Sequence, residues 1–169
     1  AREFVDETFV DICRAGDVVR FTLSPYDEQH QALLSAPIQM STRGVRLAAR
    51  KLASSTSKQI SHGLAQAARS ETPGGVIIDL LHILQELSRT YDADDLLIKD
   101  GFFSELYIHG SSQNSSGIHF CECYFGHIDV DVERSTQEYI TFDNCQIDNM
   151  SGPLTMDEAA KCLQLGSSQ

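Results

Sequence analysis

The segment GIHFCECYFG places His119, Cys121 and Cys123 at alternating positions, and these residue types bind zinc in many proteins. Zinc requires four ligands that converge on one point. In a strand, alternate side chains share a face, so His119 and Cys121 point the same way. A repeat further along the chain offers only Thr141 and Asp143 in register with them, which is a poor completing pair. We therefore expect no metal ion here and interpret the segment as strand sequence in which cysteine is a small apolar residue.

Other patterns that carry chemistry are absent from the sequence or incomplete. It contains no GxxxxGK[ST] phosphate loop, no HExxH and no GxSxG. GGVIID resembles a Walker-B strand, but without a phosphate loop we expect the start of a helix with Asp79 exposed. His30, His62 and His82 lie in segments of helical pattern, where a structural or surface role is the usual one. We predict no catalytic residues, no cofactor and no metal.

Charge and composition exclude several classes of partner. The chain has 169 residues and a net charge of −11, and its basic residues are scattered, mostly over residues 2–99. Without a basic stripe we expect no binding to nucleic acid and none to an anionic membrane surface. No apolar run approaches the roughly 20 residues of a membrane span. The five cysteines, an odd number, favour free thiols and a cytoplasmic location.

Residues 1–92 have the apolar spacing of α-helices. We expect a first helix that ends at Gly16 and further helices at about 25–35, 43–54, 58–69 and 74–90. Five short helices with short connections indicate a helical bundle or a segment of helical repeats.

From residue 94 the apolar spacing changes to that of strands and repeats every 22 residues or so. Residues 102–123 align with residues 124–145, and apolar residues coincide in columns. The columns are Leu96, Ile118 and Ile140; Ile98, Phe120 and Phe142; Phe103, Phe125 and Ile147; Leu106, Ile128 and Met150; and Ile108 and Val130. The pattern predicts a parallel β-solenoid, with a small antiparallel sheet of hairpins as the alternative.

The sequence thus predicts an α+β protein in which an N-terminal helical bundle packs on a short parallel β-solenoid with coils of about 22 residues. The expected regions are 1–92 (helical), 93–152 (β-solenoid) and 153–169 (capping helix and tail). The capping helix follows the capping box TMDE, which begins at Thr155. Such a helix would close the solenoid, or alternatively dock on a partner.

The segment FVDETFVDI, from Phe4 to Ile12, resembles the F-x-H-x-x-F-x-E-Y motif of bacterial STAND/NACHT-type signalling NTPases. Phe4 and Phe9 match its two aromatic residues, whereas Asp6, Asp11 and Ile12 replace its histidine, glutamate and tyrosine. The resemblance implies that the chain is a C-terminal piece of a larger signalling protein. It places none of that family's catalytic residues on this sequence.

The function expected from these patterns is a noncatalytic protein-interaction, sensor or scaffold module. The alternative is a small carbohydrate-active or metal-dependent enzyme that uses the acidic face of the strands. The candidate interaction surface consists of residues that alternate with the apolar columns. They are Glu105, Tyr107, His109, His119, Cys121, His127, Asp129, Asp131, Thr141 and Asp143.

Overall fold

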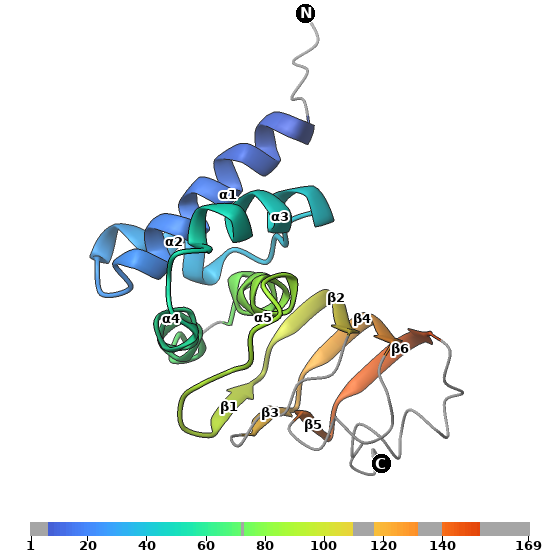
Figure 1. The fold of residues 1–169 in the computed structure, drawn as a ribbon. Coiled ribbons are helices and arrows are strands. Elements are labelled where there is room, and N and C mark those ends of the chain that lie inside the picture. The colour runs from blue at the N-terminus through green and yellow to red at the C-terminus, as the bar shows by residue number, and fades with distance from the viewer. Residues whose placement is uncertain (1–6, 72, 110–116, 132–139, 153–169) are drawn as a thin grey trace, which may run out of the picture.

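The computed structural model describes residues 7–71, 73–109, 117–131 and 140–152. Over these residues the fold is α+β, with the helices preceding the strands as expected (Figure 1). The helical elements are α1 (Glu7–Leu23), the 3-10 helix η1 (Glu28–His30), α2 (Gln31–Ser35), α3 (Thr42–Leu52), α4 (Ser57–Ala68) and α5 (Val76–Glu86). Within the described ranges, no helix has the length and apolar character that crossing a membrane requires.

Helices α3 and α4 begin at residues whose side chains satisfy free backbone amides. Ser41 Oγ accepts a hydrogen bond from the Gly44 N–H, and Thr56 Oγ1 accepts one from the Gln59 N–H at 3.0 Å. The Ser41 hydroxyl also donates to Asp11 Oδ2 at 2.8 Å, which joins the start of α3 to α1.

The extents expected for the first two helices are wrong. The first helix does not end at Gly16, because α1 continues to Leu23. Its buried face continues beyond the glycine with Val18 and Phe21, and this burial outweighs the cost of about 1 kcal/mol for glycine in a helix. The single helix expected over 25–35 is divided instead into a turn at Pro25, η1 and α2.

The strands form two parallel sheets. They are β1 (Leu96–Lys99), β2 (Phe102–His109), β3 (Ile118–Cys121), β4 (Tyr124–Asp131), β5 (Ile140–Asp143) and β6 (Gln146–Ser151). Sheet A has the order β1-β3-β5 and sheet B the order β2-β4-β6. Each predicted column is confirmed by the register; Ile98, for example, pairs with Phe120, and Phe120 with Phe142.

The predicted β-solenoid is wrong as the class of this fold. The described strands make two separate three-stranded parallel sheets. A solenoid derives its stability from a long series of stacked repeats. Here each sheet has only three strands, and its support comes from the opposite sheet and from the helices. The predicted capping helix at 153–169 lies outside the described residues.

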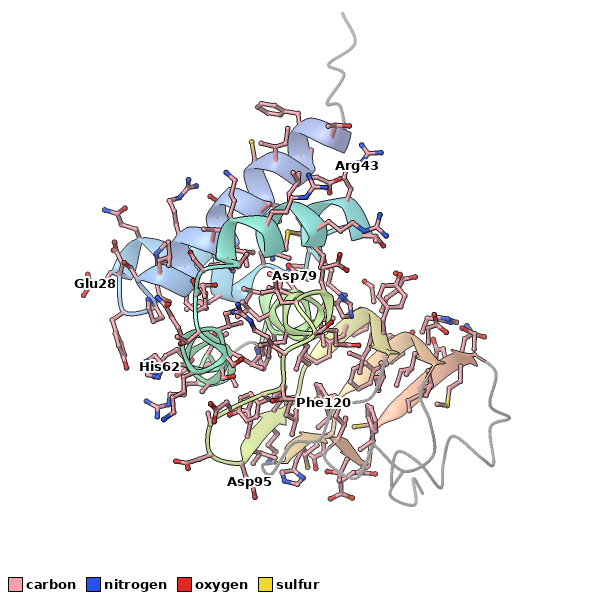
Figure 2. All side chains as sticks on the ribbon, viewed as in Figure 1. Glu28, Arg43, His62, Asp79, Asp95 and Phe120 are labelled. Atoms are coloured by element: carbon pink, nitrogen blue, oxygen red, sulfur yellow. The ribbon has the colours of Figure 1, made fainter. Side chains whose placement is uncertain are left out.

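The two sheets pack through an aromatic core. Phe120 of sheet A lies with its ring centre 5.4 Å from that of Phe142, its stacked neighbour in the same sheet. It contacts Phe103 and Phe125 of sheet B edge-on, at 6.0 and 5.1 Å between ring centres. All four side chains are at most 1% exposed, so the centre of the contact between the two sheets is closed to water. Figure 2 shows Phe120 among these strands, below α5.

Side chains from the helical part occupy the free edge of sheet B. Gln39 Nε2 donates to the Glu105 carbonyl at 2.7 Å, and Gln85 Nε2 donates to the Tyr107 carbonyl at 2.7 Å. His82 Nε2 accepts a hydrogen bond from the Tyr107 N–H at 3.0 Å. An edge strand exposes unpaired amides and carbonyls, so these contacts replace a neighbouring strand on the outer side of β2.

Candidate functional site

The two sheets divide the predicted interaction surface between two opposite faces, because each sheet buries its inner face against the other. The outer face of sheet A carries His119, Cys121, Thr141 and Asp143. The outer face of sheet B carries Glu105, Tyr107, His127 and Asp129. His109 and Asp131 pair in the register of β2 and β4, but their side chains lie outside the description.

On sheet A the predicted residues form pairs along the register. His119 Nδ1 lies 2.6 Å from Thr141 Oγ1, and Cys121 pairs with Asp143. Over the part of the chain that the structure describes, no three His, Cys, Asp or Glu side chains gather as metal ligands would. The expectation of no bound zinc remains a prediction.

On sheet B the polar side chains are joined by hydrogen bonds. The Tyr107 hydroxyl donates to Glu105 Oε2 at 2.5 Å, and this bond is the main reason that the pKa of Tyr107 is raised to about 12. Burial and the charges of Glu105 and Asp129 add to the effect. Further along, Ser151 Oγ lies 2.7 Å from His127 Nε2 and donates to Asp129 Oδ1 at 3.1 Å.

An exposed aromatic pair lies at the start of β2 and β4. Phe102 is 62% exposed, and its ring stacks on that of Tyr124 with 4.4 Å between the ring centres. The Tyr124 hydroxyl donates to Asp148 on β6. Sheet B therefore presents aromatic rings beside carboxylates on one outer face.

A cleft of about 500 Å³ opens where sheet B meets α3 and α5. It is lined by Met40, Thr42, Val45, Arg46, His82, Gln85, Glu86 and Tyr107. The volume lies in the range of ligand pockets, which is roughly 300–1,000 Å³. The ring centres of His82 and Tyr107 are 4.9 Å apart, and the hydrogen bond from the Tyr107 amide means that His82 Nε2 carries no proton. Sequence reasoning missed this cleft, because its residues come from three elements far apart in the chain.

A second hollow lies between α1 and α3. It has a volume of about 820 Å³ and is lined by Val10, Asp11, Gln39, Ser41, Thr42, Arg43, Arg46, Leu47 and Arg50. Helix α3 carries four basic residues and no acidic one, so positive charge gathers here in a chain of net charge −11. From the sequence we interpreted these basic residues as scattered. Three arginines spaced three and four residues apart on one predicted helix could have indicated that they share a face.

Asp79 is buried, and the expectation that it would be exposed is wrong. Its carboxylate is 0% exposed; Oδ1 accepts the Met40 N–H at 2.9 Å, and Oδ2 lies 3.6 Å from Arg14 Nε. Burial raises its pKa to about 7, although the Met40 amide and Arg14 act in the opposite direction. Arg14 also donates to the Ile38 carbonyl at 2.7 Å. Asp79 and Arg14 therefore hold the segment before α3 in place.

The remaining residues that the sequence singled out have ordinary surroundings. His62 lies 2.6 Å from the Tyr26 hydroxyl, and the His30 ring meets Phe21 edge-on. Of the segment that resembles the signalling NTPases, Phe9 and Ile12 lie exposed on α1, and Phe4 is outside the described residues.

Comparisons with family models, curated proteins and solved structures gave no significant match to this chain.

Proposed function

We propose that the chain is a noncatalytic protein-interaction module, serving as a sensor or scaffold in a larger cytoplasmic signalling protein. The observation that carries this proposal is the position of Tyr107. It lies on the outer face of sheet B and also forms a wall of the cleft against α3 and α5. A partner segment that follows this face therefore reaches the cleft without a break.

The chemistry of the face supports a protein partner. The exposed Phe102 ring stacked on Tyr124 provides apolar area, and aromatic residues are enriched at protein interfaces. Asp148 accepts a hydrogen bond from Tyr124 at this pair, and Glu105 and Asp129 add negative charge further along the same face. The matching partner surface would have apolar side chains bordered by Lys or Arg.

The hydrogen bonds of Ser151, His127 and Asp129 support binding over catalysis. These residue types form hydrolase triads, in which the carboxylate orients the histidine and the histidine takes the serine proton. Here the serine hydroxyl donates to Asp129, so its single proton is already engaged. His127 Nε2, 2.7 Å from Ser151 Oγ, therefore shares this hydroxyl with Asp129, which differs from a triad in which the carboxylate orients the histidine.

The larger protein and its location rest on other features. The link to a signalling protein comes from the resemblance at Phe4 to Ile12. A cytoplasmic location fits the described cysteines, which are all free thiols.

Site-specific photocrosslinking tests the proposed surface. A benzophenone amino acid placed at Tyr107 should crosslink one protein repeatedly in source-cell lysate. The same group at Thr141, on the opposite face, is the matched control and should not. Equal crosslinking from both positions would place the binding surface elsewhere.

A double variant tests the same surface without a probe. Tyr107→Ala with Asp129→Ala, neighbours in the register, should weaken capture of the crosslinked partner and leave the melting temperature nearly unchanged. His119→Ala with Thr141→Ala is the control pair on sheet A. Undiminished capture by the first variant contradicts the proposal, as does turnover of a polysaccharide or nucleotide that is lost when Asp129 is replaced.

A further inference from the structure

Cys123 and Cys145 occupy equivalent positions in the two successive turns that lead from sheet A to sheet B, between β3 and β4 and between β5 and β6. Cys123 Sγ lies 3.4 Å from the Ile98 carbonyl, and Cys145 Sγ lies 3.4 Å from the Phe120 carbonyl. Ile98 and Phe120 are themselves partners in the register. The two thiols therefore make the same contact one strand apart, in side chains that point the same way.

This placement brings the two cysteines within reach of a disulfide. The Gln146 N–H donates to the Cys123 carbonyl at 3.0 Å, so the backbones stay paired through this turn. Neighbouring strands lie about 4.8 Å apart, and disulfides join Cα atoms separated by roughly 4.4–6.8 Å. We therefore expect that rotation of the two side chains can bring the sulfur atoms into bonding distance.

The two thiols differ in exposure and in their electrostatic surroundings. A hydrogen bond from Cys123 is the main cause that lowers the pKa of Cys145, while the same bond and burial raise the pKa of Cys123. Cys145 is partly exposed, whereas Cys123 is 3% exposed. Burial and the charges of Glu122 and Asp143 raise the pKa of Cys121, so that thiol is the less reactive neighbour. The thiolate is the nucleophilic form of cysteine, and a partly exposed thiol with a lowered pKa reacts first.

We propose that Cys145 and Cys123 form a hydroperoxide-responsive pair, in which Cys145 is oxidised first and Cys123 then closes a disulfide between successive turns. The Cys145 thiolate attacks the outer oxygen of the hydroperoxide, the O–O bond breaks, and an alcohol or water leaves after taking a proton from solvent. This step oxidises the sulfur by two electrons to a sulfenic acid. The Cys123 sulfur then attacks the Cys145 sulfur, the S–S bond forms, and the S–O bond breaks. Water leaves with the proton of the Cys123 thiol.

The test treats the whole chain with hydrogen peroxide and maps the cysteines by alkylation and peptide mass spectrometry. In the parent we expect a disulfide between Cys123 and Cys145, formed several-fold faster than any oxidation of Cys121. Cys123→Ser should leave a sulfenic acid on Cys145 that dimedone traps. Cys145→Ser should leave Cys123 reduced. Cys121→Ser is the matched control, and in this variant the disulfide between Cys123 and Cys145 should form as in the parent.

Three results would overturn the proposal. They are a disulfide from Cys145 to Cys162 or to a second chain in place of Cys123, oxidation of Cys121 before Cys145, and oxidation of Cys123 at an unchanged rate in Cys145→Ser. Circular dichroism shows whether each variant is folded. Cys145→Ala replaces Cys145→Ser if the serine variant does not fold, and Cys123 should remain reduced in it as well.

Discussion

At the scale of single residues, neighbours along a strand differ sharply in what surrounds them. Phe120 is 0% exposed and touches the rings of Phe103, Phe125 and Phe142. His119, the residue before it, lies on the outer face and bonds Thr141. The contribution of a side chain to stability therefore alternates from one position to the next.

Substitution of these two residues by alanine measures the difference. Phe120→Ala should lower the free energy of unfolding by roughly 3–5 kcal/mol, because it leaves a cavity in the aromatic core. His119→Ala should cost less than about 1 kcal/mol, because it removes only an outer-face contact. Denaturant unfolding of both variants gives the two values. The reverse order would mean that the strand is shifted by one residue.

Asp79 predicts a dependence of stability on pH. Its pKa in the folded protein, about 7, lies above the ordinary value of 3.8, so the folded state retains a proton that the unfolded state loses. The contribution of Asp79 to stability is therefore complete below pH 3.8 and decreases as the pH rises through about 7.

Asp79→Asn removes this titration. Between these two pKa values, the stability of the variant relative to the parent should rise by up to about 1.4 kcal/mol per pH unit. Asp92→Asn, at an exposed carboxylate, is the control and should follow the parent. Parallel curves for the parent and Asp79→Asn would show that Asp79 is ionised throughout this range.

At the scale of elements, the contact between helices and sheets depends on side chains that act in place of a strand. Gln39 donates to the Glu105 carbonyl, and its Oε1 accepts the Ser104 N–H at 2.8 Å and the Glu105 N–H at 3.3 Å. One side chain thus satisfies three backbone groups of β2.

Gln39→Ala should lower the free energy of unfolding by about 1 kcal/mol, since water replaces part of the lost bonding. Hydrogen exchange at the Ser104 and Glu105 amides should accelerate in the same variant. Gln31→Ala, at an exposed glutamine on α2, is the control. Unchanged exchange in Gln39→Ala would mean that these amides are protected by other groups.

The strands were the most predictable elements, because bulky apolar residues return at a constant interval and only one register buries all of them. The helices were less predictable. Glycine is common at helix ends, yet the burial of residues beyond Gly16 extends α1 to Leu23. The hydrogen bonds of Gln39 and the lining of the cleft beside Tyr107 involve residues that are distant in sequence. Local sequence patterns do not predict such contacts. Asp79 shows a third limit. An acidic residue is expected at the surface until a neighbour such as Arg14 is known.

At the scale of the whole molecule, α5 connects the helical part to sheet B (Figure 1). His82 and Gln85 of this helix bond the backbone of β2, and Asp79 of the same helix holds the segment that carries Gln39. Loss of either part therefore removes support from the other.

We expect residues 7–109 and the remaining strands to unfold in one cooperative transition. Far-UV circular dichroism follows the helices, and hydrogen exchange of the amides of β2 and β4 follows the sheets. The two midpoints in denaturant should coincide in the parent. Separate midpoints would instead make the helical region 1–92 and the strand region 93–152 independent units.

The turns between the sheets have a genetic consequence. Asp100, Glu122 and Asn144 share a left-handed backbone, with φ of 59°, 54° and 53°. The amides of the first two bond the next turn in the same way, Asp100 to the Cys121 carbonyl and Glu122 to the Asp143 carbonyl. The turns after β1 and β3 thus have the same backbone, which keeps the inner columns of both sheets aligned from one strand to the next. A strand lengthened by a single residue would turn polar side chains inward. Inherited insertions of a single residue within a strand are therefore expected to be rare.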